Sequence, residues 1–155
     1  MDNRGLIEVL LGVDITGDAG RLYNAGTLAG RGGTAVRVNG NDTLLTLDSG
    51  SVLGGDAVSN GSNNRVLLQG VGQEDAALLG WTSLRMAGVD WRLAGDAAFL
   101  ESLAVDQGRL WLLDATLQAP SFEVASGAGL GGSGHLQGAV HVGEGGRLSG
   151  TAGAT

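Results

Sequence analysis

Short apolar segments recur along this 155-residue chain at nearly constant spacing, and this repeat constrains the fold more than any single motif does. In the second half, pairs of the form apolar-x-apolar recur at steps of 19, 19 and 18 in the numbering. The first members of the pairs are Leu84, Leu103, Phe122 and Val140, and the second members are Met86, Val105, Val124 and Val142. A glycine follows three of the pairs at the same offset, at Gly108, Gly127 and Gly145. The repeating unit is therefore predicted to be strand, glycine turn, strand.

The first half repeats more loosely. Residues 26–30 match 50–54 at a step of 24, and residues 41–45 match 63–67 at a step of 22. A unit of 18 to 24 residues with about three short strands is typical of a β-solenoid, so we predict an all-β fold of six to seven coils. Equivalent side chains would then lie ~4.8 Å apart along the axis, and the eight apolar residues of the pairs would point inward. A helix is considered only at residues 73–79.

The composition agrees with such a fold. Thirty glycines and a single proline, Pro120, disfavour long helices, because each interior glycine costs a helix about 1 kcal/mol relative to alanine. Apolar residues make up 43% of the chain, which is enough for a core, and the glycines lack the Gly-X-Y period of collagen.

Charge and cysteine content exclude several classes of function. The net charge is −7, with sixteen acids, nine arginines and no lysine, and no basic cluster exists, which argues against a nucleic-acid or anionic-membrane partner. The absence of cysteine removes disulfides, thiolate metal sites and cysteine nucleophiles. No segment approaches the ~20 apolar residues of a membrane-spanning helix, and the apolar patch at 6–13 is interrupted by Glu8 and too short for a secretory signal.

We interpret residues 1–155 as one domain with four parts: a first coil (1–19), irregular coils of 22–24 residues (20–79), regular coils of 18–19 residues (80–150) and a tail (151–155). The end coils of a solenoid expose unpaired strand edges, so self-association through them is expected unless they are capped.

Several segments resemble bacterial autotransporter passenger domains, the exported halves of single-chain type V secretion proteins. Residues 24–30 and 33–55 are similar to passenger repeats, and residues 127–150 to the last coils of AIDA-type passengers. Residues 83–112 resemble the C-terminal part of pertactin-like passengers, where a Trp-x-Leu-x-Gly motif, here Trp91, Leu93 and Gly95, precedes a regular coil.

The resemblance implies a right-handed parallel β-helix that is secreted or displayed on the surface of a Gram-negative cell. It also implies an autochaperone-like role for the C-terminal coils, including Trp91, Leu93 and Gly95. The partners implied are the rest of the passenger, the C-terminal outer-membrane barrel of the parent chain, and a host or neighbouring cell surface. The chain would then be a fragment of a longer rod, and no cofactor is implied.

Two acidic stretches suggest chemistry but fit turns better. The sequence LDSGS at 47–51 has the form of an aspartic-protease motif, but that chemistry needs a second carboxylate. Its apolar-x-x-Gly spacing also matches the other glycine turns, so we predict a sharp turn with Asp48 in solvent. Residues 39–47 resemble one copy of a calcium-binding repeat that needs tandem copies, and we interpret them as a polar corner. Asp14 and Asp18 are likewise interpreted as turn acids.

Histidine, serine and tryptophan are further candidates for site residues. His135 and His141 could share one coil but lack further ligands for zinc, and the glycine-flanked Ser133 lacks the strand-to-helix elbow of a nucleophile. Trp91 and Trp111 are separated by close to one coil length and are predicted to stack along the rod. An outward stack would hold sugar rings, but Trp81, Trp91 and Trp111 all lie beside apolar positions, which favours a place in the core or a coil-capping role.

These observations favour a structural and display module without catalytic residues, cofactor or metal, acting as a stalk for adhesion. A carbohydrate-binding or carbohydrate-cleaving β-helix is the main alternative, and an aspartic protease acting through Asp48 is a weaker one.

Overall fold

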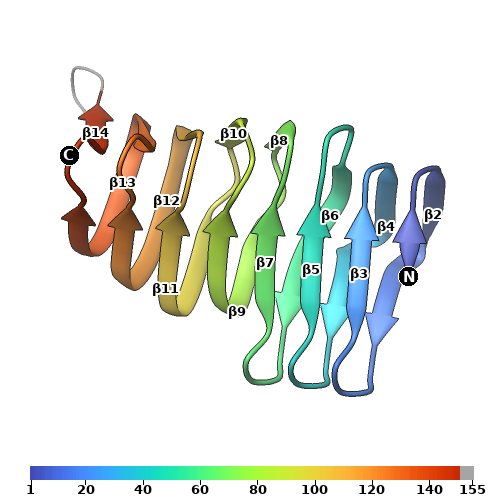
Figure 1. Cartoon of the computed structure of the whole chain (residues 1–155). Coiled ribbons are helices and arrows are strands. Elements are labelled where there is room, and N and C mark those ends of the chain that lie inside the picture. The colour runs from blue at the N-terminus through green and yellow to red at the C-terminus, as the bar shows by residue number, and fades with distance from the viewer. Residues whose placement is uncertain (151–155) are drawn as a thin grey trace.

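The computed structural model describes residues 1–150, in which fourteen strands and no helix are found. The chain winds into a β-solenoid of about eight turns, stacked side by side from the N-terminus to the C-terminus (Figure 1). The predicted all-β solenoid is thus confirmed, and the predicted six to seven coils is close to the observed number. The predicted tail lies outside the described residues.

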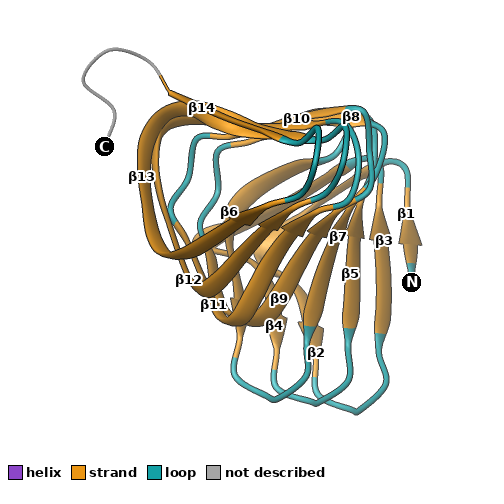
Figure 2. Cartoon of the chain, turned by 60° about the vertical axis from the view of Figure 1, so that its left-hand side comes forward, coloured by secondary structure: helices purple, strands orange, loops and turns teal. Residues whose placement is uncertain are grey.

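Three faces, each built from parallel strands, enclose one interior (Figure 2). The first face contains β1 (Asp2–Asn3), β3 (Arg21–Asn24), β5 (Leu44–Leu47), β7 (Arg65–Leu68) and the C-terminal ends of β9 (Leu78–Met86), β11 (Ala97–Val105), β12 (Arg109–Val124) and β13 (Gly129–Val142). The second face contains the beginnings of β2 (Leu6–Ile15), β4 (Thr27–Val38) and β6 (Val52–Ser59), then β8 (Val71–Glu74), β10 (Asp90–Leu93), the beginnings of β12 and β13, and β14 (Arg147–Gly150). The ends of β2, β4 and β6, the beginnings of β9 and β11, and the middles of β12 and β13 form the third face.

Alternation of apolar and polar residues decides which side chains enter the core of the first face. Every second residue points inward, so register partners on successive coils build continuous apolar columns. One column consists of Leu22, Leu45, Val66, Leu84, Leu103, Phe122 and Val140. Fully burying one such side chain contributes about 1.5 to 3 kcal/mol, so the columns supply much of the force that holds the coils together.

The turns after the first face use glycine where the backbone takes a left-handed conformation. Gly50, Gly108, Gly127 and Gly145 have φ values of +88°, +68°, +76° and +78°. A side chain at such a φ is strained, so these positions favour glycine. The four glycines that share one offset in the sequence therefore occupy the same kind of turn.

Two sequence expectations about local structure are wrong. The helix considered at 73–79 is absent, because these residues contain the end of β8, a turn and the start of β9. The repeat alignment in the first half is displaced by one residue: Leu28 pairs with Leu53 at a step of 25, not 24, and Leu45 pairs with Val66 at a step of 21, not 22. A shift of one residue exchanges the two sides of a strand. Accordingly Leu53 is buried and its neighbour Val52 is 51% exposed.

Candidate functional site

The residues predicted to point inward lie in two adjacent columns of the first face. Leu84, Leu103, Phe122 and Val140 are successive register partners, and so are Met86, Val105, Val124 and Val142. All are buried except the last member of each column. Val140 is half-buried and Val142 is 43% exposed, because they lie on the outermost described strand of this face and pack against a coil on one side only.

The Trp-x-Leu-x-Gly segment lies on β10 and the corner that follows it. Trp91 and Leu93 are buried in the second face, and the Trp91 indole N–H donates to the carbonyl oxygen of Gln69 at 2.7 Å. Gly95 lies so close to the preceding coil that a Cβ there would collide with the carbonyl oxygen of Ala76. The segment therefore fastens its coil to the preceding one: the indole fills the core and the glycine permits close backbone stacking.

The tryptophans do not form the predicted ladder. Trp91 is the register partner of Leu110, and Trp111 is the partner of Arg92, so Trp111 points to the opposite side of the sheet. Trp111 thus lies one position beyond the true partner of Trp91, and one position is enough to turn a side chain outward. The buried aromatic stack that does exist pairs Trp81 with Phe99. The basis for a sugar-stacking tryptophan ladder is therefore removed.

Glu74 is the one acidic side chain buried in the described interior. It is 1% exposed, and its Oε1 accepts long hydrogen bonds from the backbone N–H groups of Leu53 (3.4 Å) and Ala76 (3.3 Å). Its Oε2 is buried without a hydrogen-bond partner among residues 1–150. Burial away from water raises the pKa of Glu74 to about 7, and the nearby charge of Asp75 adds to the rise.

The position of Glu74 explains why a carboxyl group is found there. On the second face, β8 pairs with β10 on one side but has no strand ladder to β6 on the other. In a complete ladder, a carbonyl oxygen of β8 would accept from the Leu53 N–H. Because this ladder is missing, the Leu53 N–H donates to the Glu74 carboxyl group. Sequence reasoning missed this residue, because an acid beside Asp75 in a segment with two nearby glycines is typical of the surface.

A buried polar column occupies the N-terminal end of the first face. Asn3 and Asn24 are register partners, and the amide of Asn3 donates to Oδ1 of Asn24 at 2.8 Å. The amide of Asn24 in turn donates to Oγ of Ser51 at 2.8 Å. Both amides also reach backbone carbonyl oxygens, so their polar groups are paired despite burial. The sequence signal that could have predicted this column is the pair Asn3 and Asn24, which are separated by about one coil length.

Asp48 follows β5 at the predicted turn, but it is half-buried instead of lying in solvent. Its Oδ2 accepts a hydrogen bond from the Tyr23 hydroxyl at 2.7 Å and its Oδ1 accepts one from the Ser49 N–H at 2.7 Å. These donors hold the pKa of Asp48 below its ordinary value. The carboxylate is thus an acceptor that fastens two coils, and no second carboxylate contacts it in the hydrogen bonds of the described residues.

The other candidate ligands are dispersed. Asp42 and Asn63 form a left-handed corner in which the Asn63 amide donates to Asp42. Asp14 lies within β2 and pairs with Arg37 at 2.6 Å, so its interpretation as a turn acid is wrong, whereas Asp18 lies in a bend.

The serine and histidine candidates all belong to β13. His135 and His141 are exposed on different faces of the coil, and Oγ of Ser133 accepts a hydrogen bond from the Asp114 N–H. In residues 1–150 no three His, Asp or Glu side chains group closely enough to hold a metal ion.

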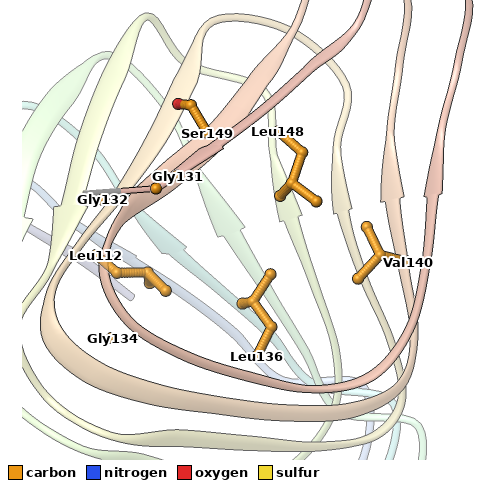
Figure 3. A pocket seen from close by; sticks show the side chains of 9 residues that line it. Leu112, Gly131, Gly132, Gly134, Leu136, Val140, Leu148 and Ser149 are labelled. Atoms are coloured by element: carbon orange, nitrogen blue, oxygen red, sulfur yellow. The ribbon is translucent and has the colours of Figure 1, made fainter. Parts of the chain in front are cut away.

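The C-terminal end of the described rod contains an apolar hollow of about 280 Å³ (Figure 3). The side chains of Leu112, Leu136, Val140 and Leu148 border it, and glycines line much of the rest. Apart from Ser149 the lining carries no polar side chain. The hollow continues the core, and its lining contains no acid or base that could activate the Ser149 hydroxyl.

The fold and these sites define the chain as a β-solenoid protein whose interior is built from stacked columns. No family model, curated protein or solved structure matches it. Residues 1–150 contain no helix that is long and apolar enough to cross a membrane.

Proposed function

We propose that this chain is a structural and display module of an autotransporter passenger, without catalytic residues of its own. The single observation that carries the proposal is the continuous apolar column along the first face, on which successive coils depend for their burial. A rod of this kind presents its surface at a distance from its anchor, and its mechanism is physical stacking. The module is proposed to act outside a Gram-negative cell, as a stalk for adhesion.

We further propose that residues 78–124 fold first and template the rest, which corresponds to the autochaperone-like role. This segment contains the aromatic core residues Trp81, Trp91, Phe99 and Phe122. In contrast, β2 at the N-terminal end has no buried residue, and β14 is exposed throughout. A folding nucleus is expected where local burial is largest.

Refolding kinetics test the nucleus with two matched variants. Leu45 and Leu103 belong to the same column and are equally buried, so Leu45→Ala and Leu103→Ala should each cost roughly 2 to 5 kcal/mol of stability. Leu103→Ala should slow refolding about tenfold or more, whereas Leu45→Ala should mainly accelerate unfolding. If Leu45→Ala slowed refolding and Leu103→Ala mainly accelerated unfolding, residues 78–124 would not be the folding nucleus.

Surface labelling tests the display role. The chain has no cysteine, so Arg92→Cys introduces a unique thiol at an exposed position of the second face. Placed between an export signal and an outer-membrane barrel in Gram-negative cells, the variant should react with a membrane-impermeant maleimide on whole cells. Reaction only after cell lysis would refute display.

A further inference from the structure

From β3 to β11, the outward register positions of the first face carry arginine and neutral residues. These positions are Arg21, Tyr23, Leu44, Thr46, Arg65, Leu67, Ser83, Arg85, Ser102 and Ala104. Three of the nine arginines of the chain lie among them. Two carboxylates bond to residues of this surface: Asp48 accepts from the Tyr23 hydroxyl, and Asp106 pairs with Arg85. Arg21 and Arg65 are the arginines of this surface that form no ion pair within residues 1–150.

A shallow groove of about 320 Å³ crosses the middle of this surface. Its outward-pointing lining residues are Leu44, Arg65, Leu67, Ser83, Arg85, Ser102 and Ala104. β9 and β11 contribute the small side chains of Ser83, Ser102 and Ala104 to the lining, and β7 and β9 contribute the longer side chains of Arg65, Leu67 and Arg85.

The polar groups of the groove repeat along the axis. Arg65, Ser83 and Ser102 are lining residues and successive register partners, so one guanidinium group and two hydroxyl groups follow one another at ~4.8 Å per coil. Ser121, the next register partner, continues this row beyond the groove lining. Arg65 makes no ion pair within residues 1–150. Arg85 pairs with Asp106 at 2.9 Å, which leaves further N–H donors of its guanidinium group for a ligand.

We propose that this groove binds a linear acidic polysaccharide, with its chain parallel to the solenoid axis. The rise of one coil is close to the length of one sugar unit in an extended chain, so each serine hydroxyl can meet a sugar hydroxyl in turn. Arg65 and Arg85 bind the carboxylates, since guanidinium groups pair with carboxylates through parallel N–H donors. Glu123, the partner of Ala104 on the next coil, places an acid beyond the groove lining and limits the site to the four coils from β5 to β11.

This inference does not depend on secretion, and it is tested on the isolated chain. Hexagalacturonate is titrated by isothermal calorimetry against the wild type, with fully methyl-esterified hexagalacturonate as the uncharged control ligand. The acidic ligand should bind at least tenfold more tightly than the ester, and its affinity should fall as salt is raised.

Matched substitutions locate the site. Arg65→Gln should weaken binding of hexagalacturonate by about tenfold, the value of one strong charge-assisted contact. Ser102→Leu places a bulky side chain in the groove lining and should also weaken binding. Arg92→Gln removes an exposed arginine from the second face and should leave binding unchanged. Equal losses with Arg65→Gln and Arg92→Gln, equal binding of the ester, or equally tight binding of polyphosphate would each overturn the proposal.

Discussion

Replacing Glu74 with glutamine should remove a pH-dependent loss of stability from this chain. The folded state holds the carboxyl proton up to a pKa of about 7, whereas the unfolded chain releases it near the ordinary value of 4.5. Between these two values the folded state binds more protons, so the free energy of unfolding falls as pH rises. The loss is complete above about pH 7 and absent below about pH 4.

The magnitude follows from the displacement of the pKa. Each pH unit between 4.5 and about 7 costs about 1.4 kcal/mol, which gives a total of about 3 kcal/mol. Glu74 is buried, so screening by solvent does not reduce this value. Glutamine keeps an oxygen that can accept from the N–H groups of Leu53 and Ala76, and it cannot ionise.

Urea unfolding followed by tryptophan fluorescence at pH 5, 6, 7 and 8 measures the effect, because Trp81 and Trp91 are buried. Glu74→Gln should be more stable than the wild type by about 3 kcal/mol at pH 8, and the gap should shrink toward pH 5. The control Glu101→Gln changes an exposed glutamate and should keep the pH profile of the wild type. Parallel profiles for the wild type and Glu74→Gln would refute the buried, protonated carboxyl group.

Three further substitutions test other parts of the structure. Leu103→Asp places an unpaired charge in the first-face column and should abolish cooperative thermal unfolding. An unchanged melting curve would contradict the inward position of Leu103 in this column. Gly95→Ala should destabilise the chain by more than about 1 kcal/mol in urea because its Cβ meets a carbonyl oxygen, whereas Gly17→Ala has open space and should cost less. Tyr23→Phe should raise the pKa of Asp48 toward its ordinary value in a carboxyl NMR titration, and an unmoved pKa would count against the Tyr23 hydrogen bond.

The sequence was sufficient to predict the β-solenoid because its second half has regular coils. Leu84, Leu103 and Phe122 are equally spaced in the sequence, and they are also successive register partners. In the first half, similar segments recur in the sequence at steps of 24 and 22 residues, whereas the paired strands are in register at steps of 25 and 21. The pattern there did not show which side of the strand faces the core, as Val52 and Leu53 illustrate.

The polar interior could not be predicted from local pattern. Glu74 is buried because a strand ladder is missing beside it, and a missing ladder is a property of the assembled coils. The groove of the first face likewise requires the register that brings Arg65, Ser83 and Ser102 into one column. Such sites depend on the register between coils, which cannot be read from residue types alone.

The most direct test of the stacked rod is a pair of distances between spin labels on its first face. Cysteine labels at Arg21 and Ser121 are separated by five coils, and labels at Arg65 and Ser121 by three. Because the chain has no native cysteine, each variant carries labels only at the chosen sites. Pulsed electron paramagnetic resonance measures both distances. At ~4.8 Å per coil, the two distance distributions should be narrow and their means should differ by about 10 Å. Equal distances, or broad distributions in both variants, would contradict the solenoid.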